Sequence, residues 1–323
     1  MSEENIPSSP LPPTLNHIVG QRLVVEQAQI ALDASFAENE PFPHALLVGP
    51  PGLGKSLLAK ILAREMASGF QEILGQSLMS PSDLHAVLLA ATDKSIVFVD
   101  ECEEIGPWLQ TTLYKAVEER KIFLESSVPR RVPQSVPLAN FTLILASNHE
   151  HELVQPLRDR MKLVLRFDYY STAELTEVLK QRARSLRWAI ENEALLLIAA
   201  RGRGTPRIAI RLMESCRRVA RAEGTANILP THVQRACGLE GIDHVGLDRQ
   251  EIHLLRILND AARPVRLNVL SSKLGLDSRT IANVFERFLI RQGLIQRTAE
   301  GRVITPAGME HLRSQQTLST ERR

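Results

Sequence analysis

The sequence predicts an α/β fold in which a parallel sheet is flanked by helices. Three short apolar runs, at 45–48, 96–99 and 141–146, each end in glycine or in polar side chains. Runs of this kind are typical of strands that are buried on both faces of a parallel sheet. A glycine-rich loop and an amphipathic helix follow the first run, with Leu57, Leu58, Ile61 and Leu62 on the apolar face of the helix. This strand–loop–helix order is typical of an α/β nucleotide-binding domain.

The loop after the first predicted strand has the sequence GPPGLGKS, residues 49–56. It matches the phosphate-binding pattern G-x-x-x-x-G-K-[ST] in the structural context that this motif requires. Its glycines allow backbone N–H groups to surround phosphate oxygens, and the helix N-terminus adds a favourable dipole. We expect Lys55 to bridge the β- and γ-phosphates and Ser56 to hold Mg²⁺. The predicted nucleotide-binding residues here are Gly49, Pro50, Pro51, Gly52, Leu53, Gly54, Lys55, Ser56 and Leu57.

Polar side chains follow the next two predicted strands. Asp100 and Glu101 end the segment IVFVDE (96–101), at the edge where parallel sheets bind ligands. Asp100 suits the organisation of Mg²⁺, and Glu101 suits the orientation or activation of the attacking water. Asn148 ends FTLILASN (141–148) and can bond the γ-phosphate or that water, although an amide there equally suits a turn cap. The pair of acids favours hydrolysis over binding alone.

Three arginines lie in unusual settings. Arg207 follows Thr205, a good N-cap, and Pro206, a good first helical residue. A cation at that end of a helix opposes the dipole, so a role against phosphate explains it better than a solvated surface does. Arg158 and Arg160 are two residues apart in LVQPLRDRMK (153–162) and repel each other unless an anion lies near. Taken alone, that pair is equally well explained by a solvated surface.

Length and composition limit the protein classes. A chain of 323 residues exceeds one compact core, so two or three domains are expected. The three cysteines form no C-x-x-C, which argues against a disulfide framework or a zinc ribbon. The N-terminus lacks the apolar run of a signal peptide, and no apolar stretch approaches the ~20 residues of a membrane span. The sequence therefore predicts a cytoplasmic protein without a membrane partner.

The net charge of +2 is unevenly distributed. Residues 1–171 carry 14 Lys and Arg against 21 Asp and Glu, residues 172–245 carry 12 against 8, and residues 246–323 carry 13 against 8. A basic C-terminal part after an acidic N-terminal part suggests a polyanionic partner for the former.

Taken in order, these segments resemble the AAA+ ATPases and, within them, the bacterial RuvB family of Holliday-junction branch-migration motors. The matching segments are LNHIVGQ (15–21), GPPGLGKS (49–56), VDE (99–101), FTLI (141–144), PLRDR (156–160), RGTPRIA (203–209) and GLIQRT with GR (293–298, 301–302). They run in family order over almost the whole chain. The phosphate loop is generic, whereas PLRDR, RGTPRIA and the LIQRT wing are together specific.

The resemblance implies three domains: a P-loop AAA+ ATPase domain at 1–171, a helical lid at 172–245, and a C-terminal winged-helix DNA-binding domain at 246–323. It implies an ATP-dependent DNA translocase or helicase that drives branch migration, with ATP and Mg²⁺ as cofactors. The implied partners are duplex or four-way-junction DNA and further copies of the chain in a homo-oligomeric ring, a hexamer. Two alternatives remain open: a remodeller or loader that acts without RuvA, and a non-enzymatic nucleotide-gated DNA-binding switch.

The resemblance also assigns residue roles. Arg160 is the arginine finger that faces the ATP of a neighbouring subunit, Arg158 is a second contact, and Arg207 is the sensor arginine within the same subunit. Glu101 and Arg160 argue against the pure switch, which needs neither. The predicted adenine contacts are Leu15, Ile18, Val19 and Tyr170, and the predicted DNA contacts are Arg279 in the recognition helix and Arg297 and Arg302 in the wing. A solvated basic surface is the alternative for the last three.

The chain departs from the family pattern at Ile18, where an aromatic is common, at LPP (11–13), where Arg-Pro is common, at Asn148, where Thr is usual, and in two longer segments. Residues 102–105, CEEI, replace the basic or histidine-containing turn that commonly follows the Asp-Glu pair. The hairpin KIFLESSVPRRVPQSVPLAN (121–140), whose counterpart docks RuvA, is shorter and less apolar, with Pro129, Pro133 and Pro137 and a basic tip, Arg130-Arg131. Prolines remove ladder donors, so we expect an edge element with an altered tip. This difference calls a RuvA-like partner into question.

Overall fold

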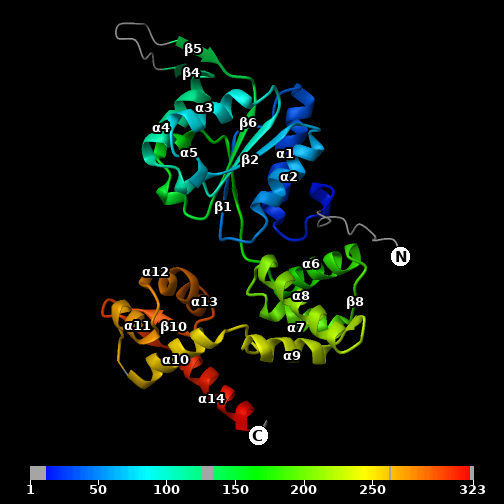
Figure 1. The fold of residues 1–323 in the computed structure, drawn as a ribbon, viewed down its shortest axis with the longest axis vertical. Helices are drawn as coiled ribbons and strands as arrows, with labels where there is room; N and C mark the ends of the chain where they lie inside the picture. The colour runs from blue at the N-terminus through cyan, green and yellow to red at the C-terminus, as the bar shows by residue number, and fades with distance from the viewer. Residues whose placement is uncertain (1–11, 125–133, 262, 321–323) are drawn as a thin grey trace. The chain divides into compact units, whose positions relative to one another are not determined.

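The computed structural model describes residues 12–124, 134–261 and 263–320 (Figure 1). The chain forms two compact units. The first comprises Met1–Arg187 with Gly204–Ile208, and the second Trp188–Arg203 with Ala209–Arg323. The segment predicted as a lid is divided between them, because α6 (Thr172–Ser185) belongs to the first unit and α7 (Asn192–Arg201) to the second.

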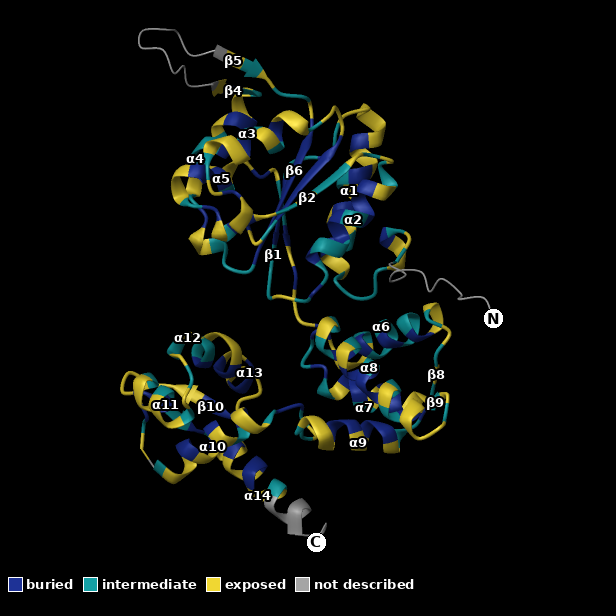
Figure 2. Ribbon diagram, in the orientation of Figure 1, coloured by how far each residue is buried: buried dark blue, intermediate teal, exposed yellow. Residues whose placement is uncertain are grey.

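A five-stranded parallel sheet forms the centre of the first unit, as the sequence predicted. Its order is β2 (Phe70–Leu74), β3 (Ile96–Asp100), β6 (Thr142–Ser147), β1 (Ala45–Val48) and β7 (Leu163–Arg166). The three runs recognised in the sequence are β1, β3 and β6, and they lie side by side in the middle of the sheet. Every residue of β6 is buried, which explains its uninterrupted apolar character (Figure 2).

Helices cover both faces of this sheet, with α1 (Arg22–Glu38) and α2 (Lys55–Glu65) on one side (Figure 1). The other side carries α3 (Pro81–Ala90), α4 (Pro107–Glu119) and α5 (Gln155–Arg160). Leu58, Ile61 and Leu62 of α2 are buried, in agreement with the apolar face predicted for that helix. Short 3-10 turns, η1 (Leu15–His17), η2 (Gly75–Ser77), η3 (Cys102–Glu104) and η4 (Glu150–Glu152), join the remaining segments.

A separate antiparallel pair, β4 (Lys121–Leu124) and β5 (Gln134–Pro137), forms the hairpin. Pro137 pairs with Lys121 at the end of the ladder, where a missing donor costs least. This two-stranded element agrees with the predicted edge hairpin. The expected changes at Pro129, Pro133 and the Arg130-Arg131 tip lie outside the described residues.

The second unit begins with a helical part. It contains β8 (Ala189–Ile190), α7, most of α8 (Pro206–Ala222), β9 (Asn227–Ile228) and α9 (Pro230–Glu240). A turn at 241–248 leads from α9 into the winged helix. Among the residues that the structure describes, no helix has both the length and the apolar character needed to cross a membrane.

The winged helix consists of α10 (Arg249–Ala261), α11 (Leu267–Leu274), a recognition helix, a two-stranded wing and α14 (Pro306–Thr320). The recognition helix runs through α12 (Ser278–Thr280), a π-helical turn, η5 (Ile281–Phe285), and α13 (Glu286–Arg291). The wing pairs β10 (Ile295–Arg297) with β11 (Arg302–Ile304), as expected. Leu254, Leu258, Ile281 and Leu289 are among the residues of one buried core that joins these helices.

Candidate functional site

A cavity of about 250 Å³ lies in the first unit, at the edge where β1, β3 and β6 end. Its lining includes residues from every motif that the sequence singled out for nucleotide chemistry. They are Pro51, Gly52, Gly54, Lys55, Ser56, Leu57, Asp100, Glu101, Asn148 and Arg207. The parallel sheet accounts for this convergence, because the loops that follow parallel strands meet at one edge.

Lys55 is held inside the phosphate loop. Its Nζ donates to the carbonyl oxygens of Gly49 (2.7 Å) and Pro50 (3.0 Å) and to Oδ1 of Asn148 (2.9 Å). The side chain is only 6% exposed. Burial lowers the pKa of Lys55, while the nearby carboxylates of Asp100 and Glu103 raise it. The ammonium is therefore held beside Asn148. The neutral oxygens that now accept its hydrogen bonds occupy positions that phosphate oxygens can take.

Ser56 and Asp100 form a pair of oxygen donors suited to Mg²⁺. The hydroxyl of Ser56 donates to Oδ2 of Asp100 at 2.7 Å. A hydroxyl and a carboxylate on adjacent elements are the oxygen ligands that Mg²⁺ accepts beside nucleotide phosphates. The residues present therefore fit the metal predicted here.

Glu101 lies in a left-handed backbone conformation, with φ +53°. Its backbone N–H donates to Oδ1 of Asp100 at 3.0 Å. Gly75 approaches so closely that a Cβ there would overlap the carbonyl oxygen of Glu101, so only glycine fits opposite this strained turn. The side chain of Glu101 is exposed to the cavity, where a carboxylate can reach a bound water.

The segment Gly204–Ile208, which carries the predicted sensor Arg207 and is called the sensor segment below, packs directly against the phosphate loop. Gly52 has φ +80°, and a Cβ there would lie 2.9 Å from Cγ2 of Thr205 and 3.0 Å from Cβ of Arg207. Glycine at this position thus allows both the loop conformation and the close approach. Arg207 belongs to the segment Gly204–Ile208 of the same unit and lines the cavity beside Lys55 and Asn148.

Glu103 is a residue of this region that the sequence motifs did not single out. Its side chain is 3% exposed, and its Oε1 accepts a hydrogen bond from the backbone N–H of Asn148 at 3.0 Å. Its Oε2 is buried and has no hydrogen-bond partner within the described residues. The carboxylate fixes the backbone of Asn148 beside Lys55. The unusual sequence CEEI (102–105) marked this turn as different. It could not reveal that Glu103 binds Asn148, because the two residues are 45 positions apart in the chain.

The four predicted adenine contacts do not line this cavity in the part of the chain that the structure describes. Leu15 is fully buried, and its N–H donates to Oε1 of Glu65 at 2.6 Å. Ile18 and Val19 are half-buried. The hydroxyl of Tyr170 donates to the carbonyl oxygen of Leu53 at 3.2 Å, and burial raises the pKa of Tyr170 to about 12. Tyr170 thus stabilises the phosphate loop through its hydrogen bond to Leu53.

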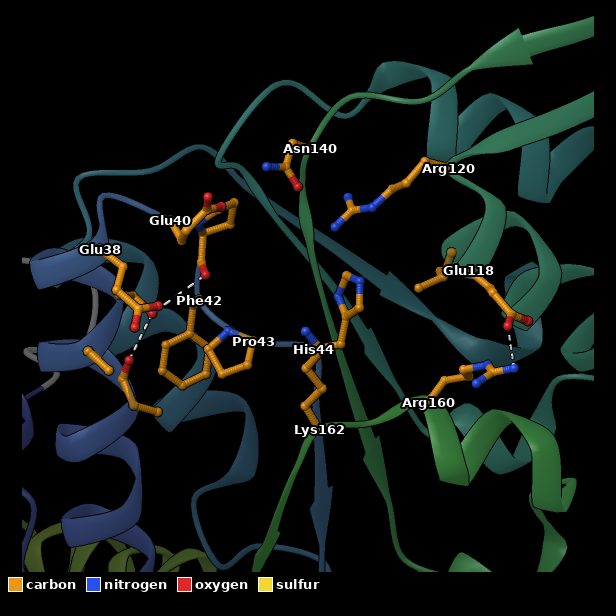
Figure 3. Close-up of a pocket in the computed structure, with 15 residues that line it drawn as sticks. Glu38, Glu40, Phe42, Pro43, His44, Glu118, Arg120, Asn140, Arg160 and Lys162 are labelled. Atoms are coloured by element: carbon orange, nitrogen blue, oxygen red, sulfur yellow. Dashed lines mark hydrogen bonds and ion pairs between the residues drawn. The ribbon is translucent and has the colours of Figure 1, made fainter.

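Arg158 and Arg160 both belong to α5, and Arg160 lies at the opposite edge of the sheet from this cavity. Arg160 ends α5, two residues before β7 begins, and pairs with Glu118 of α4 (Figure 3). It lines a second cavity of about 540 Å³, together with Arg120, Lys162 and His44, which precedes β1 (Figure 3). Burial, with smaller contributions from Arg120 and Lys162, lowers the pKa of His44 to about 4, so this ring is neutral near pH 7.

The strand register separates Arg160 from the phosphate loop of its own subunit. Lys162 and His44 lie at the amino ends of β7 and β1, whereas the loop begins at the carboxyl end of β1. Arg158 donates to Oε1 of Gln155, and its Nε is buried without a hydrogen-bond partner among the described atoms. Arg158 and Arg160 therefore do not line the nucleotide cavity of their own chain.

The predicted DNA contacts differ in their surroundings. Arg279, at the start of the recognition helix, is exposed. Arg297 and Arg302 bind the fully buried carboxylate of Glu286, with shortest distances of 2.5 Å and 2.7 Å. Arg297 keeps 51% of its side chain exposed and Arg302 only 16%. Glu286 was not recognised in the sequence, since its partners lie 11 and 16 residues away and a buried acid has no sequence signature.

Comparison with known proteins agrees with this architecture. Residues 11–167 match the model of the Holliday junction DNA helicase RuvB P-loop domain, 170–243 that of the RuvB AAA lid domain, and 244–313 that of the RuvB C-terminal winged helix domain. The chain is 36% identical to the Holliday junction branch migration complex subunit RuvB of Kosmotoga olearia, over 97% of this chain and 92% of that protein. It is 37% identical to the Ehrlichia chaffeensis subunit of the same name, over 94% and 93% of the two chains.

Solved structures give the same result. The Thermotoga maritima RuvB Holliday junction branch migration motor superimposes with a TM-score of 0.82 at 32% identity, covering 94% of this chain and 97% of that one. A mutant of the same protein gives a TM-score of 0.84, covering 94% and 99%. On this evidence, the chain belongs to the RuvB family of AAA+ ATPases.

Proposed function

We propose that this chain is an ATP-driven DNA motor that moves Holliday junctions by branch migration in recombination and repair. The observation that carries the proposal is one cavity that gathers Lys55, Ser56, Asp100, Glu101, Asn148 and Arg207. A winged helix is present in the same chain, and the relatives that span its whole length are named as branch migration subunits. An enzyme that works on DNA in bacteria is expected in the cytoplasm.

The residues of the cavity divide the work of hydrolysis among them. Lys55 exchanges its carbonyl acceptors for the β- and γ-phosphate oxygens, and Ser56 with Asp100 holds Mg²⁺, which neutralises charge on the phosphates. Glu101 orients the attacking water, and Asn148 bonds that water or the γ-phosphate. Arg207 approaches the γ-phosphate from the sensor segment.

We propose further that the complete site needs a second subunit. Arg160 lies at the amino edge of the sheet, so it is available to the nucleotide of a neighbour in a homo-oligomeric ring, and Arg158, two residues before it on α5, would be the second contact. The pairing of Arg160 with Glu118 orients the guanidinium before assembly. A hexamer is the ring size that the family resemblance implies.

The main test of the proposed function is ATPase activity without DNA, with linear duplex and with a four-way junction, each with and without a standard RuvA. Branch migration predicts the greatest stimulation by the junction with RuvA. The second candidate, a remodeller or loader that acts without RuvA, is favoured by the altered hairpin and predicts stimulation by DNA that RuvA does not change. Equal rates under all six conditions would contradict both DNA motors.

The first prediction concerns the wing. We expect Arg279→Ala and Arg297→Ala to weaken DNA binding across sequences and to flatten the salt dependence by about one unit of log–log slope each, as lost phosphate contacts do. Arg302→Ala should weaken DNA binding similarly, and both Arg297→Ala and Arg302→Ala should lower the unfolding temperature, because each leaves buried Glu286 with one partner fewer. The measurements are binding isotherms at several salt concentrations and thermal unfolding.

The matched control for the wing is Arg313→Ala, which removes an exposed arginine of α14 outside the recognition helix and wing. It should leave the salt slope as it is in the unaltered chain. An unchanged slope for folded Arg279→Ala and Arg297→Ala would instead place these residues on an ordinary solvated surface.

The second prediction concerns the hairpin. Among its described side chains, Phe123 is the large apolar one that is exposed, and the Nζ of Lys121 lies 5.1 Å from the centre of its ring. The sequence of 121–140 also lacks an evident apolar docking ridge, so we expect weak or absent binding to a standard RuvA. Co-elution of a complex at micromolar concentration would show this prediction to be wrong and would favour the ordinary branch-migration assembly.

A further inference from the structure

Two histidines and an aspartate meet in the second unit, away from the nucleotide cavity. Asp243 and His244 lie in the turn between α9 and α10, and His311 lies on α14. One potential ligand atom from each residue lies within 4.8 Å of the other two. The side chains of Asp243 and His311 are 3% and 6% exposed, whereas His244 is exposed to solvent. Two members of the cluster are thus buried, and the third is accessible to solvent.

The carboxylate of Asp243 is fixed in its orientation by the backbone. Its Oδ1 accepts hydrogen bonds from the N–H groups of Val245 (2.9 Å), Gly246 (2.8 Å) and Leu247 (2.8 Å). These three donors hold the carboxylate so that its second oxygen, Oδ2, is directed toward His311 and Gln315.

Oδ2 of Asp243 is in contact with one imidazole nitrogen and with one amide nitrogen. His311 Nε2 lies 2.7 Å from Oδ2, and Gln315 Nε2 lies 3.1 Å from it. Gln315 Nε2 is also 3.2 Å from His244 Nδ1, so one amide group bridges the aspartate and the exposed histidine. The two imidazole rings stack, with centroids 5.1 Å apart and planes 25° from parallel. This stacking keeps one nitrogen of each ring within 4.8 Å of a carboxylate oxygen of Asp243.

We propose that Asp243 Oδ2, His244 Nδ1 and His311 Nε2 bind a divalent transition metal of the Zn²⁺ class. Zinc binds nitrogen and carboxylate oxygen at about 2.0–2.2 Å, so tetrahedral ligand atoms lie roughly 3.4 Å apart. Reaching that spacing from the present arrangement requires side-chain movements of about 1.5 Å or less. Two imidazoles exclude Mg²⁺ as the preferred ion, since Mg²⁺ demands oxygen ligands. Water or the amide oxygen of Gln315 would complete the coordination.

Metal binding here would stabilise the connection between the helical part of the second unit and its winged helix. Asp243 and His244 belong to the connection from α9 to α10, and His311 belongs to the last helix of the winged helix. An ion held by both segments would tie the connection to α14. The cluster shares no residue with the nucleotide cavity, so the inference does not depend on the proposed function.

The competing explanation is a plain buried ion pair between His311 and Asp243. That pair needs no contribution from exposed His244, so His244 distinguishes the two explanations. A suitable experiment is calorimetric titration of the untagged full-length chain with ZnCl₂ in the absence of nucleotide, followed by thermal unfolding with and without Zn²⁺. The matched control is His253→Asn, which removes an exposed histidine of α10 in the same unit.

We expect one equivalent of Zn²⁺ to bind the wild-type chain and the His253→Asn variant alike. His244→Asn should weaken binding by at least the roughly 10- to 100-fold loss that follows removal of an outer-shell partner, because it removes a direct ligand. Zn²⁺ should raise the unfolding temperature of the first two proteins and leave that of His244→Asn unchanged. Without Zn²⁺, all three should unfold at the same temperature, since His244 is exposed. Equal affinity in wild type and His244→Asn, or no stoichiometric binding, would overturn the proposal in favour of the ion pair.

Discussion

Glu101→Gln is expected to bind ATP with nearly wild-type affinity and to lose hydrolysis by roughly 10²- to 10⁴-fold, the usual contribution of a catalytic acid or base. The side chain lines the cavity but makes none of the bonds that hold Lys55 or Ser56 in place. An amide of the same shape leaves those bonds intact, yet it cannot take up a proton or carry the charge that orients the water. The measurements are equilibrium nucleotide binding and steady-state ATPase activity.

Two further variants sharpen this prediction. Lys55→Ala should lose nucleotide affinity itself, because the phosphates lose their buried point charge and the loop loses three hydrogen bonds. Glu104→Gln is the matched control, since this neighbouring carboxylate is exposed and does not line the cavity. It should turn over ATP at the wild-type rate. A Glu101→Gln protein that hydrolyses as fast as Glu104→Gln would show that the role given to Glu101 is wrong.

The parts of this site that could be predicted are short segments that contain the functional side chains and directly follow a recognisable strand. The loop at 49–56 and the Asp-Glu pair after β3 each follow a strand that is recognisable from its apolar run, and parallel strands bring such segments to one edge. What the sequence could not supply were pairings across long separations. Glu103 with Asn148, and Glu286 with the two wing arginines, depend on burial that only the folded chain creates.

The adenine contacts stay a prediction. Leu15, Ile18, Val19 and Tyr170 were chosen from the family resemblance, and they lie outside the lining of the described cavity, which is the expected place of the phosphates and not of the base. The hydroxyl of Tyr170 donates to the carbonyl oxygen of Leu53 in the loop. An apolar or aromatic residue that supports a binding loop and one that contacts the base have the same appearance in a sequence, because both are buried.

Arg160→Ala is expected to bind ATP almost normally but to hydrolyse it about 10³-fold or more slowly, as other arginine fingers do when removed. Its own cavity keeps Lys55, Ser56 and Arg207, while Arg160 lies at the far edge of the sheet beside Glu118. Loss of the guanidinium should therefore weaken the stabilisation of charge on the transferring phosphoryl group in a neighbouring subunit. It should leave the nucleotide affinity of its own subunit unchanged. Nucleotide binding is measured on dilute monomers and ATPase activity on assembled protein.

Mixing two inactive variants tests whether Arg160 acts on a neighbour. Arg160→Ala subunits have a sound pocket without a finger, and Lys55→Ala subunits have a finger without a sound pocket. Where the two are adjacent in the right order, one composite site is whole, so ATPase activity should reappear on mixing. The matched control replaces Lys55→Ala with the Lys55→Ala/Arg160→Ala double variant, which supplies neither part and should rescue nothing.

The deciding comparison is nucleotide binding by the dilute Arg160→Ala monomer, because activity in mixtures also depends on whether sites must fire around the whole ring. A residue that serves the neighbouring subunit cannot change affinity in a protein that has no neighbour. If dilute Arg160→Ala loses ATP binding, Arg160 acts within its own subunit, against the separation that the strand register imposes between β7 and the loop after β1. If binding persists while turnover falls, the guanidinium acts across the subunit interface, and the pairing of Arg160 with Glu118 is the arrangement that holds it ready for assembly.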